Sequence, residues 1–485
     1  MSELTVSEAV KFGTSGVRGL ADRLLGGDAG IYTRAFIEHL MRSGLVAAGG
    51  SIAVGEDLRP SSAAIGEAVC AAIFQAGLKP VRCGAVPTPA LACFAMGRGM
   101  AAIMVTGSHI PADRNGLKFY RPDGEIDKQD EAAIMQILAE QSSHAVGAHS
   151  TGEVAAAEAD ALAFYRDRYR GFLPDAALAG RRVGIWEQSS VARSLLGEIV
   201  TSSGGEPVLL GRSAQFVPVD TEALGATDAA RLAAWIVSEQ LDLMISTDAD
   251  ADRPLVIDEK GRQVRGDALG LIAAKILNAG SVVTPVTSSS GIEAGLSAPV
   301  LRTRVGSPFV IAGMAEAVSA GHRNVVGFEA NGGFLTGSDI TYSGHVLPAL
   351  PTRDALLPIL CIFIAMGETG AAASEIVSGL GLPVALSDRL QNYPIAKGQT
   401  LMRRLADDAA FCEQFLDGLG AVEGKDATDG VKFFLAERMI LHLRPSGNAP
   451  EMRCYVEAPN RDAAEALLTE GLRRLKAFAL VGVEH

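Results

Sequence analysis

The sequence predicts an α/β fold class with mixed, largely parallel sheets, and three observations support this. Short apolar runs alternate with Ala- and Leu-rich amphipathic stretches along almost the whole chain. Hydrophobic residues make up 48% of the chain and charged residues 20%, which is enough apolar material for large cores. The chain has 54 glycines but only 5% aromatic residues, which indicates many tight turns. Strands that alternate with helices form right-handed βαβ units, so neighbouring strands should be parallel.

The individual elements follow from the positions of these runs. Strands are expected at 51–55, 101–107, 183–186, 242–247 and 281–287. Helices are expected at 61–77, 89–98, 190–204 and 355–366. The last of these has only 12 residues and contains Pro358, so it is too short to cross a membrane and reads as a buried helix.

The length of 485 residues suggests three domains, with two to four admissible, at about 150 residues per domain. The alternating pattern is interrupted at 140–157, which is small and polar, at the charged turn 258–266, and at the Gly-rich stretch 367–390. These interruptions predict four segments, which are 1–150, 151–258, 259–372 and 373–485.

The charge of the chain excludes one class of partner. There are 43 Lys and Arg residues against 56 Asp and Glu, which gives a formal charge of −13. A nucleic-acid-binding protein normally carries a basic patch, so we expect no nucleic-acid partner. Six cysteines without CxxC spacing favour buried thiols in a reducing compartment. The N-terminal residues lack a signal-peptide pattern, so we expect a cytoplasmic protein with no membrane partner.

The segment TGSHIPADRNGLKF (106–119) directly follows an apolar strand. Ligands of α/β sheets bind at this end of the strands. Gly107 would let a bulky group approach the hydroxyl of Ser108 closely. A hydrolase nucleophile elbow is excluded, because Ile110 stands where its GxSxG pattern needs glycine. Taken alone, the segment is more typical of a plain turn.

Three carboxylates, Asp248, Asp250 and Asp252, alternate directly after the strand at 242–247. They repel one another unless a cation lies among them or they spread into solvent. Oxygen-only ligands suit a hard cation such as Mg²⁺. An EF-hand is excluded, because Arg253 occupies the loop position that needs glycine. A solvated acidic turn is the alternative.

Two further loops carry groups that suit a sugar phosphate. In 325–338, Glu329 and Asn331 offer hydrogen-bonding groups to sugar hydroxyls, although an ordinary turn explains this loop better when it is taken alone. In 443–457, Arg444 and Arg453 surround a Pro-Ser-Gly turn between two strand-like runs. Arginine forks and backbone N–H groups suit a phosphate dianion, and a hairpin with an exposed arginine is the alternative.

These four segments occur in the order and spacing of the α-D-phosphohexomutase superfamily, the phosphoglucomutase/phosphomannomutase enzymes, which the chain resembles from residue 12 to residue 453. Four further stretches resemble motifs of this superfamily: FGTSGVRG (12–19), VGEDLRPSS (54–62), VPTP (86–89) and TRVGSPFV (303–310). The resemblance implies three related α/β domains and a C-terminal α+β domain around a central cleft. It also implies a mutase that interconverts hexose 1-phosphate and 6-phosphate through a phosphoserine and a bisphosphorylated sugar.

The resemblance implies a role for each candidate residue. Ser108 would be the phosphoserine, Lys118 a general acid/base with a lowered pKa, and His109 a support of the serine loop. Arg18 and Arg253 would add positive charge at the reaction centre. One Mg²⁺ per chain would be held by Ser108, Asp248, Asp250 and Asp252. The substrate would be bound by Glu329, Asn331, Gly306, Arg444, Ser446, Gly447, Asn448 and Arg453. A hexose 1,6-bisphosphate would activate the enzyme, which would be a monomer or a homodimer.

Several positions depart from the superfamily's usual motifs and loosen the substrate assignment. Asn331 replaces a serine and no histidine follows it, while Asn448 and Ala449 replace a Thr-Glu pair. Mannose phosphate is the favoured substrate, glucose phosphate or dual specificity comes next, and glucosamine phosphate ranks third. A non-catalytic sugar-phosphate-binding paralogue and a Mg²⁺-dependent phosphatase are the alternatives from other functional classes.

Overall fold

The structure, a computed structural model, describes residues 10–13, 16–141, 155–156, 158–174, 176–446 and 450–480. The chain forms two compact units. The first unit comprises residues 1–283 and 306–379, and the second comprises residues 284–305 and 380–485. The expected linker at 140–157 lies mostly outside the described residues. The division into four segments stays a prediction.

The first sheet of the first unit mixes parallel and antiparallel strands in the order β1-β2-β6-β5-β3-β4-β8, with β7 beside β6. Its strands are β1 (Lys11–Phe12), β2 (Val17–Leu20), β3 (Ser51–Glu56), β4 (Lys79–Ala85), β5 (Ala101–Val105), β6 (Arg114–Arg121), β7 (Gly124–Glu125) and β8 (Ala155–Ala156). Its helices are α1 (Ala21–Arg23), η1 (Leu24–Asp28), α2 (Ala29–Arg42), α3 (Ser62–Gln75), α4 (Thr88–Met96), α5 (Lys128–Gln141) and α6 (Glu158–Tyr169).

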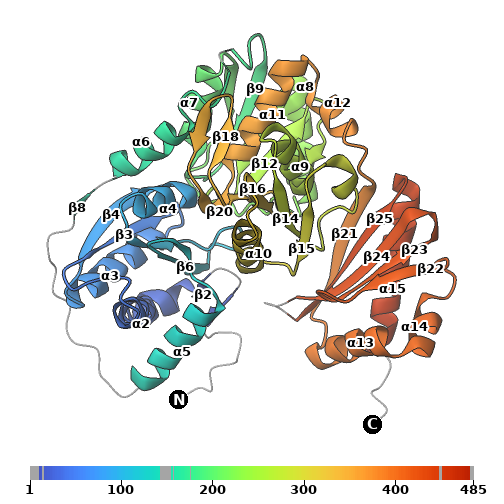
Figure 1. Ribbon diagram of the computed structural model, residues 1–485, viewed down its shortest axis with the longest axis horizontal. Helices are drawn as coiled ribbons and strands as arrows, with labels where there is room; N and C mark the ends of the chain where they lie inside the picture. Colours follow the sequence, from blue (N-terminus) through green and yellow to red (C-terminus); the bar gives the residue numbers. More distant parts are fainter. Residues whose placement is uncertain are drawn as a thin grey trace. The chain divides into compact units, whose positions relative to one another are not determined.

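Helices cover both faces of this sheet. Figure 1 shows α2, α3 and α5 on one side of it and α4 on the other. Ile52 and Val54 of β3 belong to one buried cluster, whereas Ala53 between them belongs to another that includes Leu91 and Phe94 of α4. Because successive side chains of a strand point to opposite faces, a continuous apolar strand is buried on both sides.

The second sheet has the order β10-β9-β11-β12-β13. Strands β9 and β10 and strands β9 and β11 are parallel, and β12 and β13 are antiparallel to their neighbours. Its strands are β9 (Arg182–Trp186), β10 (Glu206–Leu210), β11 (Leu243–Thr247), β12 (Pro254–Asp258) and β13 (Gln263–Val264), and its helices are α7 (Arg193–Ser202) and α8 (Ala226–Ser238).

A third sheet carries parallel β14 and β16 followed by antiparallel β17 and β20. These strands are β14 (Ser281–Pro285), β16 (Val325–Phe328), β17 (Phe334–Thr336) and β20 (Leu350–Asp354). The helices of this region are α9 (Gly266–Ile276), α10 (Ser307–Ser319), α11 (Leu356–Thr369) and α12 (Ala373–Ser378), and β18 (Ile340–Tyr342) pairs with β19 (His345–Leu347).

The same arrangement of strand, loop and strand occurs in all three sheets. The strands β5, β11 and β16 each have a parallel neighbour, and each leads through a short polar loop into an antiparallel partner, which is β6, β12 or β17. The serine, aspartate and sugar loops are these three connections. The predicted α/β fold class with mixed sheets is therefore confirmed.

The second unit contains an antiparallel sheet in the order β21-β25-β24-β23-β22. The strands of this sheet are β21 (Val384–Gln391), β22 (Val422–Asp426), β23 (Val431–Leu435), β24 (Met439–Pro445) and β25 (Glu451–Ala458). The unit also contains η2 (Glu293–Gly295), β15 (Val300–Thr303), α13 (Ile395–Asp407), α14 (Ala409–Leu416), η3 (Ala436–Arg438) and α15 (Arg461–Leu480). Alternate residues of β23, β24 and β25 pack with α13, α14 and α15 in one apolar core, which makes this unit α+β.

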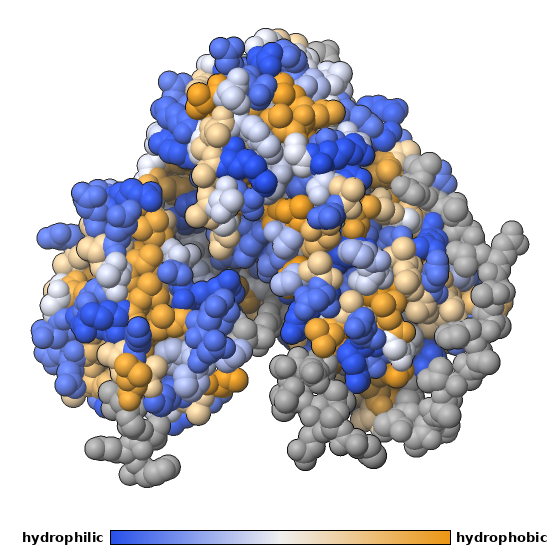
Figure 2. Space-filling model, turned by 180° about the vertical axis from the view of Figure 1, so that it is seen from behind, coloured by the Kyte–Doolittle hydropathy of each residue, from blue (hydrophilic) through white to orange (hydrophobic). Residues whose placement is uncertain are grey.

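Hydrophobic residues on the face shown in Figure 2 lie in separate groups among hydrophilic ones. Exposed large apolar side chains such as Leu209, Val237 and Ile395 come from different elements. Scattered apolar residues of this kind are ordinary on a protein surface. None of the helices described here combines the length and the apolar character that crossing a membrane requires.

Candidate active site

Ser108 lies in the loop between β5 and β6 and is only 1% exposed. Its backbone φ of 54° is in the left-handed region, which a residue other than glycine seldom adopts. The N–H of Ser108 donates to Thr106 Oγ1 at 2.8 Å, and its Oγ donates to Asp248 Oδ2 at 2.5 Å. A strained residue that hydrogen bonds hold in one conformation is typical of a functional site.

Arg59 organises the rest of the serine loop. Its guanidinium donates to four backbone carbonyl oxygens at 2.6 to 3.0 Å, those of Pro111, Arg114, Ser108 and Ile110. Asp57 accepts from Arg59 Nε at 3.1 Å and from Thr106 Oγ1 at 2.7 Å. This buried ion pair satisfies the loop's carbonyls and so fixes the backbone around Ser108.

The aspartate loop between β11 and β12 brings three buried carboxylates together. One oxygen from each of Asp248, Asp250 and Asp252 lies within 4.8 Å of the others. Burial, followed by the charges of Asp250 and Asp252, raises the pKa of Asp248 well above its ordinary value. The solvated acidic turn is therefore wrong, since at most 1% of each residue is exposed.

These residues fit a hard cation. The buried oxygens Asp250 Oδ1 and Asp252 Oδ1 accept no hydrogen bond, although a buried carboxylate oxygen ordinarily does. A divalent cation would satisfy both oxygens and relieve the repulsion that raises the pKa of Asp248.

Lys118 on β6 reaches the same cluster from another strand. Its Nζ donates to Asp250 Oδ2 and to Asp252 Oδ2, both at 2.5 Å. Burial acts to lower the pKa of Lys118, but Asp250 and Asp252 outweigh it and the pKa is raised. The expected lowering of this pKa is therefore wrong for this arrangement, because two carboxylates stabilise the ammonium form.

Arg253 and His109 lie beside the serine. Arg253 Nη1 donates to His109 Nδ1 at 3.0 Å, and this ring nitrogen lies 3.4 Å from Ser108 Oγ. Burial, with the charges of Arg253 and Arg18, lowers the pKa of His109 to about 2. His109 is therefore neutral at physiological pH and accepts a hydrogen bond, which suits a supporting role.

Arg18 on β2 shares the same electrostatic environment. Burial, with repulsion from Arg253 and Arg353, lowers the pKa of Arg18 to about 10. The positive charges of these arginines act against one another through buried protein. An anion placed among them would relieve that repulsion.

The sugar loop joins β16 to β17. The N–H of Glu329 donates to the Gly333 carbonyl at 3.1 Å, and Asn331 Oδ1 accepts from the Gly333 N–H at 2.9 Å. Asn331 Nδ2 lies 3.5 Å from Glu329 Oε2. The side chain of Asn331 therefore holds the shape of the loop and contacts the carboxylate of Glu329.

The predicted phosphate-binding residues of the second unit lie on one hairpin. Arg444 of β24 and Arg453 of β25 are direct cross-strand partners, and the Ser446 N–H donates to the Glu451 carbonyl at 2.9 Å. Arg444 Nε lies 2.9 Å from Asp429 Oδ2. Gly447 and Asn448 lie outside the described residues. Gly306 precedes α10 in the first unit with a φ of 131°, which strongly favours glycine.

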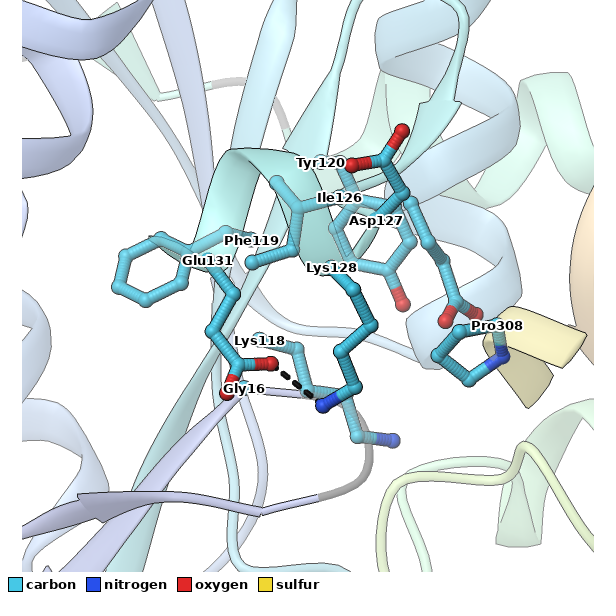
Figure 3. Close-up of a pocket in the computed structure, with 10 residues that line it drawn as sticks. Gly16, Lys118, Phe119, Tyr120, Ile126, Asp127, Lys128, Glu131 and Pro308 are labelled. Carbon is cyan, nitrogen blue, oxygen red and sulfur yellow. Dashed lines mark hydrogen bonds and ion pairs between the residues drawn. The ribbon is translucent and has the colours of Figure 1, made fainter. Parts of the chain in front are cut away.

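A small pocket opens beside Lys118 (Figure 3). Lys128 and Glu131 form an ion pair of 2.5 Å at this pocket. Its described lining residues include Lys118 but none of the three aspartates and not Ser108. The buried cluster, rather than this pocket, therefore carries the groups suited to chemistry.

Comparisons with known proteins show the family of this chain. Two family models match the chain: "Phosphoglucomutase/phosphomannomutase, alpha/beta/alpha domain I" over residues 9–145, and domain III of the same family over residues 265–381. A phosphomannomutase from Sinorhizobium fredii is 48% identical over 468 residues, which cover 96% of this chain and 99% of the relative. The chain belongs to the phosphoglucomutase/phosphomannomutase family.

Other relatives support this placement. A phosphomannomutase from Salmonella muenchen is 40% identical and covers 96% of both chains. A phosphoglucosamine mutase from Mycolicibacterium paratuberculosis is 29% identical, over 94% of this chain and 97% of the relative. A phosphoglucomutase/phosphomannomutase family protein from Burkholderia thailandensis has a similar fold, with a TM-score of 0.73 at 20% identity over 96% of this chain and 97% of that one.

Sequence reasoning missed several residues of this phosphoglucomutase/phosphomannomutase site. Arg59 stands in the quoted stretch VGEDLRPSS, but no role was predicted for it. Gln188 and Ser190, in the turn after β9, hydrogen-bond Thr247 just before the aspartate loop. Arg353 contacts both Asp252 and Glu329, and the only signal for it is an arginine in the short strand sequence LPTRD (350–354).

Proposed function

We propose that this family member is a phosphomannomutase that interconverts mannose 1-phosphate and mannose 6-phosphate. The observation that carries the proposal is the 2.5 Å hydrogen bond from Ser108 Oγ to Asp248, inside a cluster that also holds Lys118. A nucleophile, a candidate acid/base and a candidate cation site are thereby assembled within hydrogen-bond reach. The names of the relatives at 48% and 40% identity support mannose phosphate as the substrate.

In the proposed reaction the phosphate ester of Ser108 is the phosphoryl donor. The bond between phosphorus and Ser108 Oγ breaks, and a bond forms to a free hydroxyl oxygen of the bound sugar phosphate. Lys118, the candidate acid/base, takes the hydroxyl proton or returns a proton to Ser108 Oγ. The bisphosphorylated sugar then reorients, and its other phosphate returns to Ser108, so the enzyme is regenerated and the phosphate has changed position.

The other residues bind, orient and neutralise. The aspartates would hold Mg²⁺, which supplies charge neutralisation to the transferring phosphoryl group. Arg18 and Arg253 stabilise the same negative charge, and His109 orients Arg253. Glu329 accepts from sugar hydroxyls. Arg444, Ser446 and Arg453 bind the phosphate that does not react, together with Gly447 and Asn448.

One assay separates the candidate functions. The purified protein, with Mg²⁺ and a trace of glucose 1,6-bisphosphate as activator, is given mannose 1-phosphate, glucose 1-phosphate or glucosamine 1-phosphate. We expect the 6-phosphate to form fastest from mannose 1-phosphate. Faster turnover of another sugar would overturn the mannose assignment. Release of inorganic phosphate would identify a phosphatase, and absence of turnover would identify a non-catalytic binding protein.

Two further expectations stay predictions: a cytoplasmic location, and a monomer or homodimer. Light scattering of the eluting protein during size-exclusion chromatography measures the second directly, and a trimer or tetramer would contradict it.

A further inference from the structure

Arg353 on β20 joins the aspartate loop to the sugar loop, and it is only 2% exposed. Its Nε and Nη2 donate to Asp252 Oδ2 at 3.0 and 2.8 Å. Its Nη1 donates to Glu329 Oε2 at 3.1 Å. One planar guanidinium therefore binds two carboxylates from two different loops through a fixed fork of donors, which the ammonium group of a lysine does not provide.

The chain makes room for this arginine at Gly333. A Cβ atom on Gly333 would lie 2.5 Å from Arg353 Cδ and 2.8 Å from Arg353 Cγ. Any larger residue at this position would therefore displace the stem of Arg353. The absence of a side chain at Gly333, the second glycine of the sugar loop, lets the arginine stem lie against the loop.

Arg353 also shares an acceptor with the candidate acid/base. Lys118 Nζ donates to the same oxygen, Asp252 Oδ2, at 2.5 Å. The other oxygen, Asp252 Oδ1, accepts no hydrogen bond, so both strong donors occupy one side of the carboxylate. Lys118, Asp252, Arg353 and Glu329 thereby form one continuous chain of charge-assisted hydrogen bonds from the reacting cluster to the sugar loop.

We propose that Arg353 is a positioning residue that sets Glu329 for the sugar and ties the orientation of that carboxylate to the cluster of Lys118 and Asp252. This inference rests on the proposed function, because it concerns binding of a sugar phosphate at the same site. Without Arg353, the buried Glu329 carboxylate loses its cationic partner and its fixed orientation. Sugar binding then weakens, and the hydrogen-bonded link between Glu329 and the cluster of Lys118 and Asp252 is broken.

The experiment compares Arg353→Gln, Arg353→Lys, Glu329→Gln and the double variant with Gln at both positions. We expect Arg353→Gln to raise KM for mannose 1-phosphate about tenfold, and Arg353→Lys to recover part of this loss, since it keeps the charge but lacks the planar fork of donors. The effect of Arg353→Gln on KM should nearly vanish in the Glu329→Gln background, because the partner is already gone. If the two substitutions raise KM by independent factors that multiply in the double variant, the inference is overturned.

Two controls separate positioning from folding and from loss of the proposed function. Arg168→Gln removes an arginine of the same unit that binds the Pro348 carbonyl and contacts Thr336 instead. Should Arg168→Gln raise KM as much as Arg353→Gln does, the effect is structural and the inference is wrong. Calorimetric binding of mannose 1-phosphate is also measured in Ser108→Ala protein with and without Arg353→Gln. We expect tenfold weaker binding with Arg353→Gln.

The wild-type result separates the two failures. If the wild type turns over mannose 1-phosphate but the Arg353 variants bind it normally, only the positioning role fails. If the wild type neither binds nor converts any sugar phosphate, the proposed function fails and the positioning role fails with it. If Arg353→Gln does not fold, Arg353→Lys and Glu329→Gln test the same link from both ends.

Discussion

Two regions of this protein carry its candidate phosphate chemistry, and they handle charge in opposite ways. In the first unit, Lys118, Asp252 and Arg353 are buried and contact one another directly. In the second unit, Arg444 and Arg453 stand directly opposite each other on neighbouring strands, although like charges at such positions repel. The reacting cluster therefore alternates positive and negative groups, whereas the hairpin places two arginines side by side and pairs Arg444 with Asp429 at 2.9 Å.

This difference predicts which measurements respond in each region. Changes in the buried cluster should lower kcat, because those groups are arranged around the reacting atoms. Changes in the arginine hairpin should raise KM, because the proposed role of that region is to bind the phosphate that does not react.

The largest effect is expected from Ser108→Ala. This change removes the only oxygen of the residue that can carry the phosphoryl group, so kcat should fall by at least about 10³-fold. Intact-mass measurement should show a phosphate on the wild type that is absent from the variant. A variant that still carries the phosphate would assign the nucleophile to another residue.

Removal of the metal should be the next largest effect. Chelation leaves three buried carboxylates without a cation, and we expect activity to fall by about 10²- to 10³-fold and to return with Mg²⁺. Asp250→Asn should weaken Mn²⁺ binding, measured by electron paramagnetic resonance, whereas Asp228→Asn on α8 should leave it unchanged. Full activity in the presence of chelator would contradict the metal site.

Arg59→Gln tests whether the serine loop must be held. The variant loses the forked donation to four carbonyls, so Ser108 should shift and kcat should fall by about 10- to 10²-fold with KM little changed. Steady-state kinetics measure both constants, and Arg98→Gln on a neighbouring loop is the control. A rise in KM alone would mean that Arg59 belongs to binding rather than to positioning.

Arg444→Gln should show the opposite pattern. Loss of one charge-assisted bond to phosphate should raise KM about tenfold while kcat stays within a few-fold. Arg389→Gln, on the neighbouring strand β21, removes an arginine near the hairpin and should change neither constant. Equal effects from both variants would point to general electrostatics instead of a phosphate site.

The smallest effect concerns His442, a buried neighbour of this hairpin. Burial is the main cause that lowers the pKa of His442 to about 4, while its Nε2 donates to the Asp429 carbonyl at 2.7 Å. In the unfolded chain this histidine has an ordinary pKa of about 6.5 and binds a proton more readily than in the folded protein. The stability that neutral His442 contributes above about pH 6.5 is therefore lost as the pH falls toward 4. We expect the free energy of unfolding to fall by about 2 kcal/mol between pH 7 and pH 5, measured from the denaturant-unfolding transition of the second unit. If His442→Gln leaves the pH dependence of the unfolding free energy unchanged, other titrating groups cause the effect.

Much of the fold and part of the site could be predicted from local sequence. The expected strand at 51–55 corresponds to β3, and the apolar stretch at 355–366 forms the buried helix α11. The helix expected from residue 190 begins at Arg193 instead, because the preceding residues form a turn that hydrogen-bonds Thr247. Propensity cannot reveal such a contact, since its partner lies almost sixty residues away.

The pKa of Lys118 shows that local sequence also fails to reveal the charged partners that set the chemistry of a site. The role implied by the family resemblance requires a lowered pKa, but the structure places two aspartates from another strand connection on the ammonium group of Lys118. Burial alone would lower the pKa of Lys118. The net direction depends on partners that are distant in the chain.

The sequence by itself determined the α/β alternation, the polar loop after each central strand and the residue types those loops carry, because all of these depend on neighbours along the chain. Only the tertiary structure decided that Lys118, Asp252 and Arg353 meet at one carboxylate oxygen. These residues come from different sheets of the first unit, and each strand's local pattern states which face is buried without stating what lies opposite. Register and packing between the sheets supply that information, and with it the link between the reacting cluster and the sugar loop.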